Sequence, residues 1–479
     1  MNYRMIIYIL GWVLKMEGAS MLIPLITAIC YGESSEITIF SACVVICLGL
    51  GFLINFHQPK TKVMYAKEGF VTVALSWIVL SIFGSFPFII SEYIPNYIDA
   101  FFETVSGFST TGASILNDVE ILPKSLLMWR SLTHWIGGMG VLVFLMAILP
   151  LSGSGNLYLL KAESPGPSVS KLVPRVKSTA MFLYGIYIVF TIVEIIMLLV
   201  GGLDLFESLT LAFGTAGTGG FAIKNTGIAE YSPYIQYVIT AFMILFGIDF
   251  TLYSGASFRG IKTFLKSEEF RVYIGIIAFS TLFIFMNSGY MFSDGESAFR
   301  NILFTVGSTV TSTGYGVTDY NMWPEFSKVI VVILMFIGAC AGSTGGGIKV
   351  SRIIILFKSI VKEIRTSAHP RTTLKIKMNG RTVEHETVRG VNVFMASYVV
   401  IYGVALLLIS LDNFDFTTNF TSIVACLNNI GPGLGMVGPI GNYAEFSGFS
   451  KLILSACMII GRLEIFPMLL LFSPYTWKK

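Results

Sequence analysis

The fold depends on residues 310–316, Val310-Thr311-Ser312-Thr313-Gly314-Tyr315-Gly316. This stretch follows an apolar run, and it is too short and too polar to cross a membrane by itself. Glycine adopts backbone conformations that other residues resist, so the stretch is predicted to form a loop. In such a loop the backbone carbonyls, rather than the side chains, are the groups available for binding.

The composition indicates an integral membrane protein. The 479 residues are 54% hydrophobic and 13% charged, with a mean hydropathy of +0.75, which is more apolar surface than a soluble core can bury. The first apolar run contains Lys15 and Glu17 and lacks a small-x-small cleavage site, so we expect a retained helix rather than a signal peptide. The six cysteines lack metal-ligand spacing, so redox chemistry is not indicated.

Ten candidate spans emerge from windows of about 20 residues, the length that about 30 Å of hydrocarbon requires. They lie at 5–30, 38–56, 68–93, 127–150, 179–201, 233–257, 271–292, 327–358, 390–411 and 449–474. Most of the 32 Lys and Arg residues fall in the loops on the side of the chain ends, with the largest group between Lys349 and Arg389. Because Lys and Arg favour cytoplasmic loops, both termini are predicted to be cytoplasmic.

Four segments between these spans are too long and too apolar to be simple connections. They cover residues 97–116, 204–225, 296–318 and 414–436, and each has a polar start, a short apolar helix and a loop rich in Thr, Gly or Asn. A helix of about ten residues cannot span the bilayer, so we expect re-entrant loops beside a water-filled cavity or buried in protein.

The four loops align on one glycine each: Gly112, Gly220, Gly314 and Gly431. Six positions before these glycines stand the small residues Ser106, Gly214, Ser308 and Ala425. Gly219 is an alternative to Gly220 in the second loop, and Gly433 and Gly435 are alternatives to Gly431 in the fourth. Every unit contains a span, a re-entrant loop and a span, so the chain is predicted to hold an internal repeat that occurs four times.

The predicted fold is therefore all-α, with ten transmembrane helices and four re-entrant pore loops. It consists of two N-terminal helices (1–60) and four repeats of helix, pore loop and helix (61–160, 161–262, 263–365 and 389–479). Between the third and fourth repeats, residues 366–388 are predicted to form a cytoplasmic hairpin. The hairpin rests on two alternating stretches around Asn379-Gly380, a signal typical of a type I′ turn.

Residues 312–316 resemble the TVGYG filter of potassium channels, in which backbone carbonyls replace the hydration shell of the ion. From about residue 68 onward, the four loops, the Gly-rich eighth span and Arg462-Leu463-Glu464 together resemble the membrane subunit of the Trk/Ktr/HKT superfamily of potassium transporters. The two additional N-terminal spans make the chain similar to the Trk type, of TrkH and TrkG, rather than to the eight-span Ktr type.

The resemblance implies potassium uptake across the bacterial plasma (inner) membrane, with K+ as the transported ion and no organic cofactor in this chain. In that superfamily a serine at the first filter glycine goes with sodium permeation, so Gly112 implies a preference for K+. The implied filter residues are Thr110, Thr111 and Gly112; Thr218, Gly219 and Gly220; Ser312, Thr313 and Gly314; and Asn429, Ile430 and Gly431.

The eighth span contains a Gly-rich segment, residues 338–349, that cannot form a good helix because each glycine costs up to about 1 kcal/mol. A phosphate-binding P-loop is one alternative, but Ile348 and Val350 break its pattern. Close packing of helices through small residues is another. The resemblance implies instead a mobile gate below the filter, formed by Gly342, Ser343, Thr344, Gly345, Gly346, Gly347, Lys349 and Arg462.

Arg462 lies near the middle of the last predicted span, where a charge is costly and indicates a functional role. One alternative is an ion pair with a buried acid, either Glu464, Glu194 or Asp249. The family motif implies the other, an arginine that faces the pore below the filter and raises the barrier to a passing cation.

Two further expectations concern the outer side. Arg130 and His134 are expected to lie at the membrane interface, with their polar ends in contact with water. Outer acids such as Asp99 and Glu103 are expected to concentrate cations at the mouth of the pore.

Implied partners are a second copy of the chain, in a homodimer, and a separate cytosolic nucleotide-binding subunit similar to TrkA. Anionic membrane lipid is an alternative partner for the basic inner loop, and no nucleic acid is expected. The sequence shows no nucleophile with a base and no clustered histidines, so an enzyme is not predicted. The alternatives are an alternating-access transporter of a small solute, for which inverted repeats are typical, and a Na+-permeable or cation-coupled variant of the same scaffold.

Overall fold

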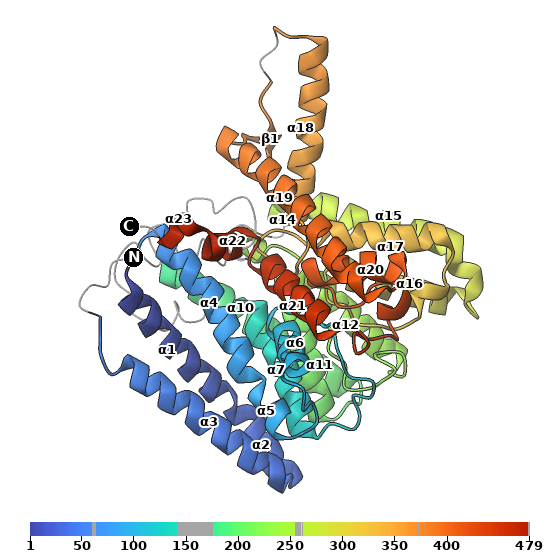
Figure 1. Ribbon diagram of the computed structural model, residues 1–479. Coiled ribbons are helices and arrows are strands. Elements are labelled where there is room, and N and C mark those ends of the chain that lie inside the picture. Colours follow the sequence, from blue (N-terminus) through green and yellow to red (C-terminus); the bar gives the residue numbers. More distant parts are fainter. Residues whose placement is uncertain (60–63, 141–175, 254–259, 261, 372–373, 478–479) are drawn as a thin grey trace.

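The computed structural model describes residues 1–59, 64–140, 176–253, 260, 262–371 and 374–477. Within these ranges the chain is helical apart from loops and one pair of two-residue strands. Helices α1 (Tyr3–Ser20) and α2 (Leu22–Tyr31) follow one another and pack against α3 (Ser34–Asn55). These three helices form one edge of the bundle, next to α4 (Figure 1).

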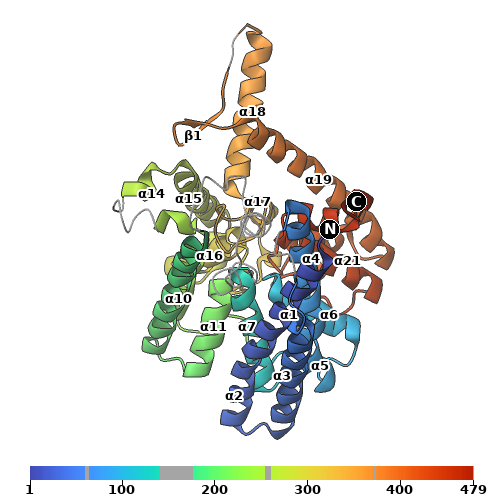
Figure 2. The same cartoon turned by 90° about the vertical axis from the view of Figure 1, so that its left-hand side faces the viewer.

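The same order of elements then occurs four times: one long helix or helix pair, a short helix of 12–16 residues, a loop, and a helix of 13–15 residues. The units succeed one another around the molecule, from blue through green and yellow to red (Figure 2). Their helices are α4 (Ala66–Gly84), α5 (Phe86–Ile90), α6 (Tyr97–Phe108) and α7 (Lys124–Gly138); α10 (Val176–Val200), α11 (Leu205–Gly217) and α12 (Pro233–Phe246); α15 (Glu268–Ser288), α16 (Gly295–Val310) and α17 (Glu325–Ile337); and α19 (His385–Ile409), α20 (Phe416–Leu427) and α21 (Gly448–Arg462).

Six segments of the described chain are helical, long and apolar enough to cross a membrane, and the chain is a multi-pass membrane protein. They are Tyr3–Tyr31, Ser34–Asn55, Ala66–Ile90, Met181–Val200, Glu268–Met291 and His385–Asp412. The other four predicted spans begin with α7, α12, α17 and α21, so the total of ten stays a prediction. Residues 141–150 of the predicted span 127–150 lie outside the described residues.

The last helix of each unit stops at or beside a glycine. Three of the predicted spans, 233–257, 327–358 and 449–474, are interrupted rather than continuous. α12 ends at Phe246 with Gly247 as its cap, where a Cβ would lie 2.4 Å from the hydroxyl of Tyr273. α21 ends at Arg462, because Glu464 and Ile465 have φ of 54° and 72°, before α22 (Phe466–Phe472) begins.

The short helix of every unit has a polar N-cap. Each cap accepts a hydrogen bond from a free N–H of the first turn: Asn96 from Ile98 (2.9 Å), Asp204 from Glu207 (2.6 Å), Asp294 from Ser297 (2.7 Å) and Asp415 from Thr418 (3.0 Å). The hydrogen bond from the Ser297 N–H lowers the pKa of Asp294. Those from the hydroxyl and N–H of Thr418 lower the pKa of Asp415.

Helix α18 (Val350–Ala368) projects away from the bundle in both views, and the hairpin lies near its base, beside α15 (Figures 1 and 2). Strand β1 (Lys377–Met378) pairs antiparallel with β2 (Arg381–Thr382), with Lys377 opposite Thr382. The turn residues Asn379 and Gly380 both have positive φ, 51° and 76°, as a type I′ turn requires. The predicted hairpin turn is therefore confirmed, while residues 372–373 lie outside the described chain.

Candidate functional site

The four loops that follow α6, α11, α16 and α20 share one backbone conformation. Each aligned glycine has a positive φ, and so does the residue two positions before it. The glycine values are 80° (Gly112), 76° (Gly220), 80° (Gly314) and 92° (Gly431), and the earlier residues are Thr110 (56°), Thr218 (52°), Ser312 (56°) and Asn429 (55°). Gly219 and Gly433 lack a positive φ, and Gly435 has one (66°) but the residue two positions before it does not, so the shared conformation favours Gly220 and Gly431 as the equivalent positions.

A common backbone hydrogen bond joins each loop to the small residue six positions before its glycine. The N–H immediately before the glycine donates to the carbonyl of that small residue, which ends the short helix with a Schellman-type turn. The bonds are Thr111 to Ser106 (2.9 Å), Gly219 to Gly214 (2.9 Å), Thr313 to Ser308 (2.8 Å) and Ile430 to Ala425 (2.8 Å). The four loops therefore leave their helices in the same direction relative to each helix.

The aligned glycines form a closed ring of backbone contacts. Each faces the carbonyl oxygen of the residue that precedes the next glycine in the ring, and the fourth loop returns to the first. The closeness of these contacts is given by the distance from a Cβ built on each glycine to the facing carbonyl oxygen. The distances are 2.0 Å (Gly112 to the oxygen of Gly219), 2.1 Å (Gly220 to Thr313), 1.8 Å (Gly314 to Ile430) and 2.6 Å (Gly431 to Thr111). The ring thus contains eight of the twelve sequence-predicted filter residues, and the other four, Thr110, Thr218, Ser312 and Asn429, stand two positions before its glycines.

The electrostatics of the ring favour a cation. All four short helices direct their C-terminal ends, which carry partial negative charge, toward it. The side chains there are neutral and buried, among them Thr111, Thr313 and Asn429. Among the described residues no group of three His, Cys, Asp or Glu is placed to hold a metal, so the charge on the ring comes from backbone dipoles.

Arg130 and His134 lie behind the ring and not at the membrane interface, so that prediction is wrong. Arg130 is 2% exposed, and its guanidinium pairs with the buried carboxylate of Glu103 at 2.7 Å. The imidazole of His134 lies 2.8 Å from the Gly107 carbonyl and 3.3 Å from the N–H of Phe221. A buried arginine requires a paired charge, and here the pair and the histidine connect the first and second loops.

The expectation that outer acids concentrate cations is likewise wrong for Glu103. Its carboxylate is buried and accepts hydrogen bonds from the Ser114 hydroxyl and the Ile115 N–H, both at 3.0 Å. Asp99 pairs with Lys451 at 2.6 Å. Both acids therefore hold protein groups in place.

Tyr443 is a supporting residue that the sequence did not reveal. Its hydroxyl donates to the carbonyl of Gly431 at 2.7 Å. Tyr443→Phe is expected to lower stability by about 0.5–1.5 kcal/mol, the usual net value of one hydrogen bond, and to weaken cation selectivity slightly. Thermal unfolding and ion competition would measure both. Tyr402→Phe is the matched control, because that hydroxyl bonds to Phe420 at 3.0 Å, away from the ring; equal selectivity in the two variants would contradict the supporting role.

The Gly-rich segment lies directly against the third and fourth loops. The N–H of Gly346 donates to the Ser312 hydroxyl, and the N–H of Gly347 donates to the Asn428 carbonyl at 3.1 Å. The segment also holds itself together, because Ser343 bonds to the Cys340 carbonyl at 2.6 Å and the Lys349 ammonium bonds to that of Gly345. Gly345, Gly346 and Gly347 thus contact the third and fourth loops, whereas Gly342 and Thr344 contact Phe250 and Phe246, just beyond and at the end of α12.

Arg462 joins this segment to the first unit. It is the last residue of α21, so the chain does not continue as a helix around it. Its guanidinium donates to the carbonyls of Thr344 at 2.8 Å and Gly138 at 2.6 Å, and also to that of Gly137. Glu464, one of its predicted partners, pairs with Arg352.

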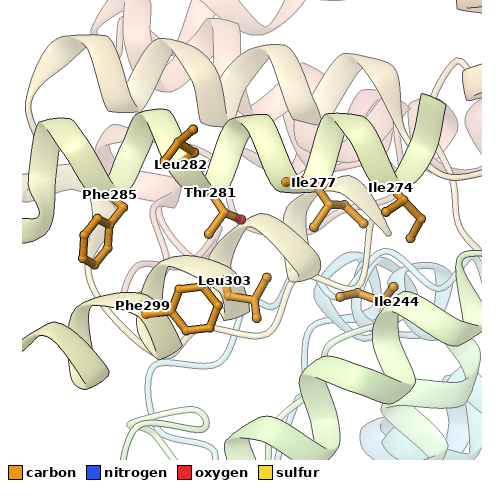
Figure 3. A pocket seen from close by; sticks show the side chains of 9 residues that line it. Ile244, Ile274, Ile277, Thr281, Leu282, Phe285, Phe299 and Leu303 are labelled. Carbon is orange, nitrogen blue, oxygen red and sulfur yellow. The ribbon is translucent and has the colours of Figure 1, made fainter. Parts of the chain in front are cut away.

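An apolar cavity of about 530 Å³ lies apart from the ring, between α12, α15 and α16 (Figure 3). Thr281 is the one polar residue among those that line it, and the rest include Ile244, Phe285 and Leu303. Because such a wall cannot replace the hydration shell of an ion, the ring is the better candidate for a cation site.

The fold and the ring together define a class: a multi-pass membrane protein built from four similar units around shared, buried loops. A family model described as "TrkH: Cation transport protein" matches residues 34–479, and the chain belongs to this family. The chain is 35% identical to the Trk system potassium uptake protein TrkH of Escherichia coli K12, with 100% of both chains covered. It is 32% identical to TrkG of the same organism, with 100% of this chain and 99% of TrkG covered.

The fold also matches the crystal structure of the potassium transporter TrkH from Vibrio parahaemolyticus, with a TM-score of 0.90, 31% identity and full coverage of both chains. The family consists of transporters, so this chain is a transporter and not an enzyme. The resemblance to the Trk type of the superfamily is confirmed.

Proposed function

We propose that the chain takes up K+ across the bacterial plasma membrane through the ring of four loops. The closed ring of glycine-to-carbonyl contacts carries this proposal. Carbonyls held at fixed positions replace the hydration shell of a dehydrated cation, and the relatives are named as potassium uptake proteins. Gly112 at the first position supports K+ over Na+ as the preferred ion.

The ring forms a short filter. Only the third loop continues with Tyr315 and Gly316, whereas the others continue with Ala113, Phe221 and Pro432. The hydroxyl of Tyr315 bonds to the Leu211 carbonyl at 3.0 Å, behind the ring. We expect fewer ion sites than in a channel with four identical loops.

The Gly-rich segment and Arg462 form the gate of this proposal. The segment contacts the ring through Ser312 and Asn428, and Arg462 ties it to α7. The guanidinium charge in this position repels a cation that leaves the ring, and release of the segment opens the path.

The proposed arrangement in the membrane has ten spans and both termini in the cytoplasm. The rings of Tyr3 and Trp477 stack with centroids 6.3 Å apart, which supports a common side for the two ends. The short helices α6, α11, α16 and α20 enter from the outer side as re-entrant segments. The proposed units are residues 61–160, 161–262, 263–365 and 389–479, after the N-terminal pair 1–60 and around the hairpin 366–388.

The proposed partners are a second copy of the chain, a cytosolic nucleotide-binding subunit and membrane lipid. The relatives are named as parts of a Trk system, and the projecting α18 and the hairpin offer a docking surface for a soluble subunit (Figure 1). An alternating-access mechanism receives less support, because all four short helices lead to one ring rather than forming inverted pairs.

Uptake of ⁸⁶Rb+ into proteoliposomes that contain the purified chain, in competition with Na+, tests the function. Selective Rb+ uptake is expected. Equal uptake of Na+ would contradict the K+ filter, and the absence of any cation flux would contradict the pore.

A further inference from the structure

Two adjacent acids in the first turn of α15 contact the Gly-rich segment, α18 and the hairpin. Glu269 is 8% exposed, and one of its oxygens accepts the N–H of Ala341 at 2.7 Å and the N–H of Ser351 at 3.1 Å. Ala341 lies near the beginning of the Gly-rich segment, and Ser351 follows its end. One carboxylate therefore holds both ends of this segment.

Glu268, the preceding residue, contacts α18 and the hairpin. Its carboxylate pairs with Lys358 of α18, whose ammonium also bonds to the Lys377 carbonyl at 2.7 Å. The backbone N–H of Glu268 donates to the side-chain oxygen of Asn379, at the tip of the hairpin, at 2.6 Å. The tip of the hairpin is thus fastened to the residue next to the one that holds the Gly-rich segment.

Stabilisation of α15 alone is the simpler explanation for two acids in its first turn, where they interact favourably with the helix dipole. That role does not require the contacts observed. The N–H of Phe270 is already capped by Ser267 at 3.3 Å, and the Glu269 oxygen is directed to two N–H groups that lie 72 and 82 residues further along the chain. Hydrogen bonds from N–H groups to a carboxylate are stronger than neutral ones.

We propose that Glu268 and Glu269 form a latch. Glu269 is a positioning residue that keeps the Gly-rich segment against the ring, and Glu268 couples the same turn to the hairpin. Displacement of the hairpin tip by a docked soluble partner then pulls on this turn and loosens the segment. The proposal rests on the gate of the proposed function and adds the route by which a cytoplasmic contact reaches it.

Flux variants test the Glu269 half of the latch. Glu269→Ala is expected to raise ⁸⁶Rb+ uptake several-fold with an unchanged Rb+/Na+ ratio, because the ring itself is not altered. Glu269→Gln retains an acceptor oxygen without the charge and is expected to lie between the wild type and Glu269→Ala. Glu325→Ala is the control, an 86% exposed acid in the first turn of α17. Unchanged flux in Glu269→Ala, or a loss of selectivity equal to the change in flux, would overturn the positioning role.

Hydrogen exchange tests the coupling, and it does so without relying on a variant in the buried part. Asn379→Gly removes the side-chain oxygen but keeps the positive φ that the turn needs. Amides of residues 338–352 are expected to exchange faster in this variant than in the wild type, and the same variant is expected to raise flux. Unchanged exchange at 338–352 would overturn the coupling. Absence of Rb+ uptake by the wild type would instead contradict the proposed function. The exchange rates at 338–352 would still test the coupling between the hairpin and the Gly-rich segment in that case.

Discussion

Gly112→Ser is expected to reduce the preference for Rb+ over Na+ by about tenfold to a hundredfold. A Cβ at this position would lie 2.0 Å from the Gly219 carbonyl oxygen, and the backbone φ is +80°. The serine therefore moves the carbonyl of the second loop or changes its own backbone. Strain of this kind costs roughly 1–3 kcal/mol, and about 1.4 kcal/mol corresponds to a factor of ten in relative affinity.

Gly307→Ser provides the matched control for this prediction. Gly307 belongs to α16, beside the third loop, and the nearest atom to a Cβ there is the Thr240 methyl carbon at 3.6 Å. This variant is expected to keep the wild-type Rb+/Na+ ratio in competition assays. If both serines change the ratio equally, or neither does, the ring is not what sets selectivity.

Arg462→Ala is expected to raise ⁸⁶Rb+ flux by at least about tenfold. The substitution removes the hydrogen bonds from the guanidinium to Thr344 and Gly138 and a positive charge next to the ring. Hydrogen bonds to a charged group contribute about 1.5–3 kcal/mol, so the loss of one is enough for a tenfold shift toward the open segment. Initial uptake rates, normalised to the amount of reconstituted protein, measure the effect.

Two further variants separate the charge from the hydrogen bonds. Arg462→Lys keeps the charge but makes fewer hydrogen bonds, so an intermediate flux is expected. Deletion of residues 343–347 removes the segment itself and is expected to match or exceed Arg462→Ala. Wild-type flux in both Arg462→Ala and the deletion would contradict the assignment of the Gly-rich segment and Arg462 as the gate.

Much of the fold follows from periodic features of the sequence. Helix length and hydropathy located the long helices, and the Asn379-Gly380 pair located the hairpin turn. The equivalence of the four loops was visible in the spacing between Gly314 and Ser308 and in its three counterparts. The reason lies in local physics, since a turn that ends a helix needs the same few residue types wherever it occurs.

The interruptions of the predicted spans after α12 and α21 and the burial of Arg130 were not predicted, because they depend on contacts between distant parts of the chain. Gly247 caps α12 and Gly461 lies one residue before the end of α21. A glycine inside an apolar run is, however, also compatible with close helix packing. Arg130 lies 27 residues after Glu103, and nothing local indicates that the two meet. The latch residue Glu269 was hidden for the same reason, since its partners lie more than 70 residues away in sequence.

Anomalous diffraction from crystals of the chain grown in Rb+ tests the central claim most directly. Rb+ is expected on the axis of the ring, coordinated by backbone carbonyls of the four loops around Gly112, Gly220, Gly314 and Gly431. Gly112→Ser is expected to weaken this peak while the rest of the structure is retained. A protein that transports Rb+ but binds it elsewhere, with no anomalous peak in the ring, would contradict the claim.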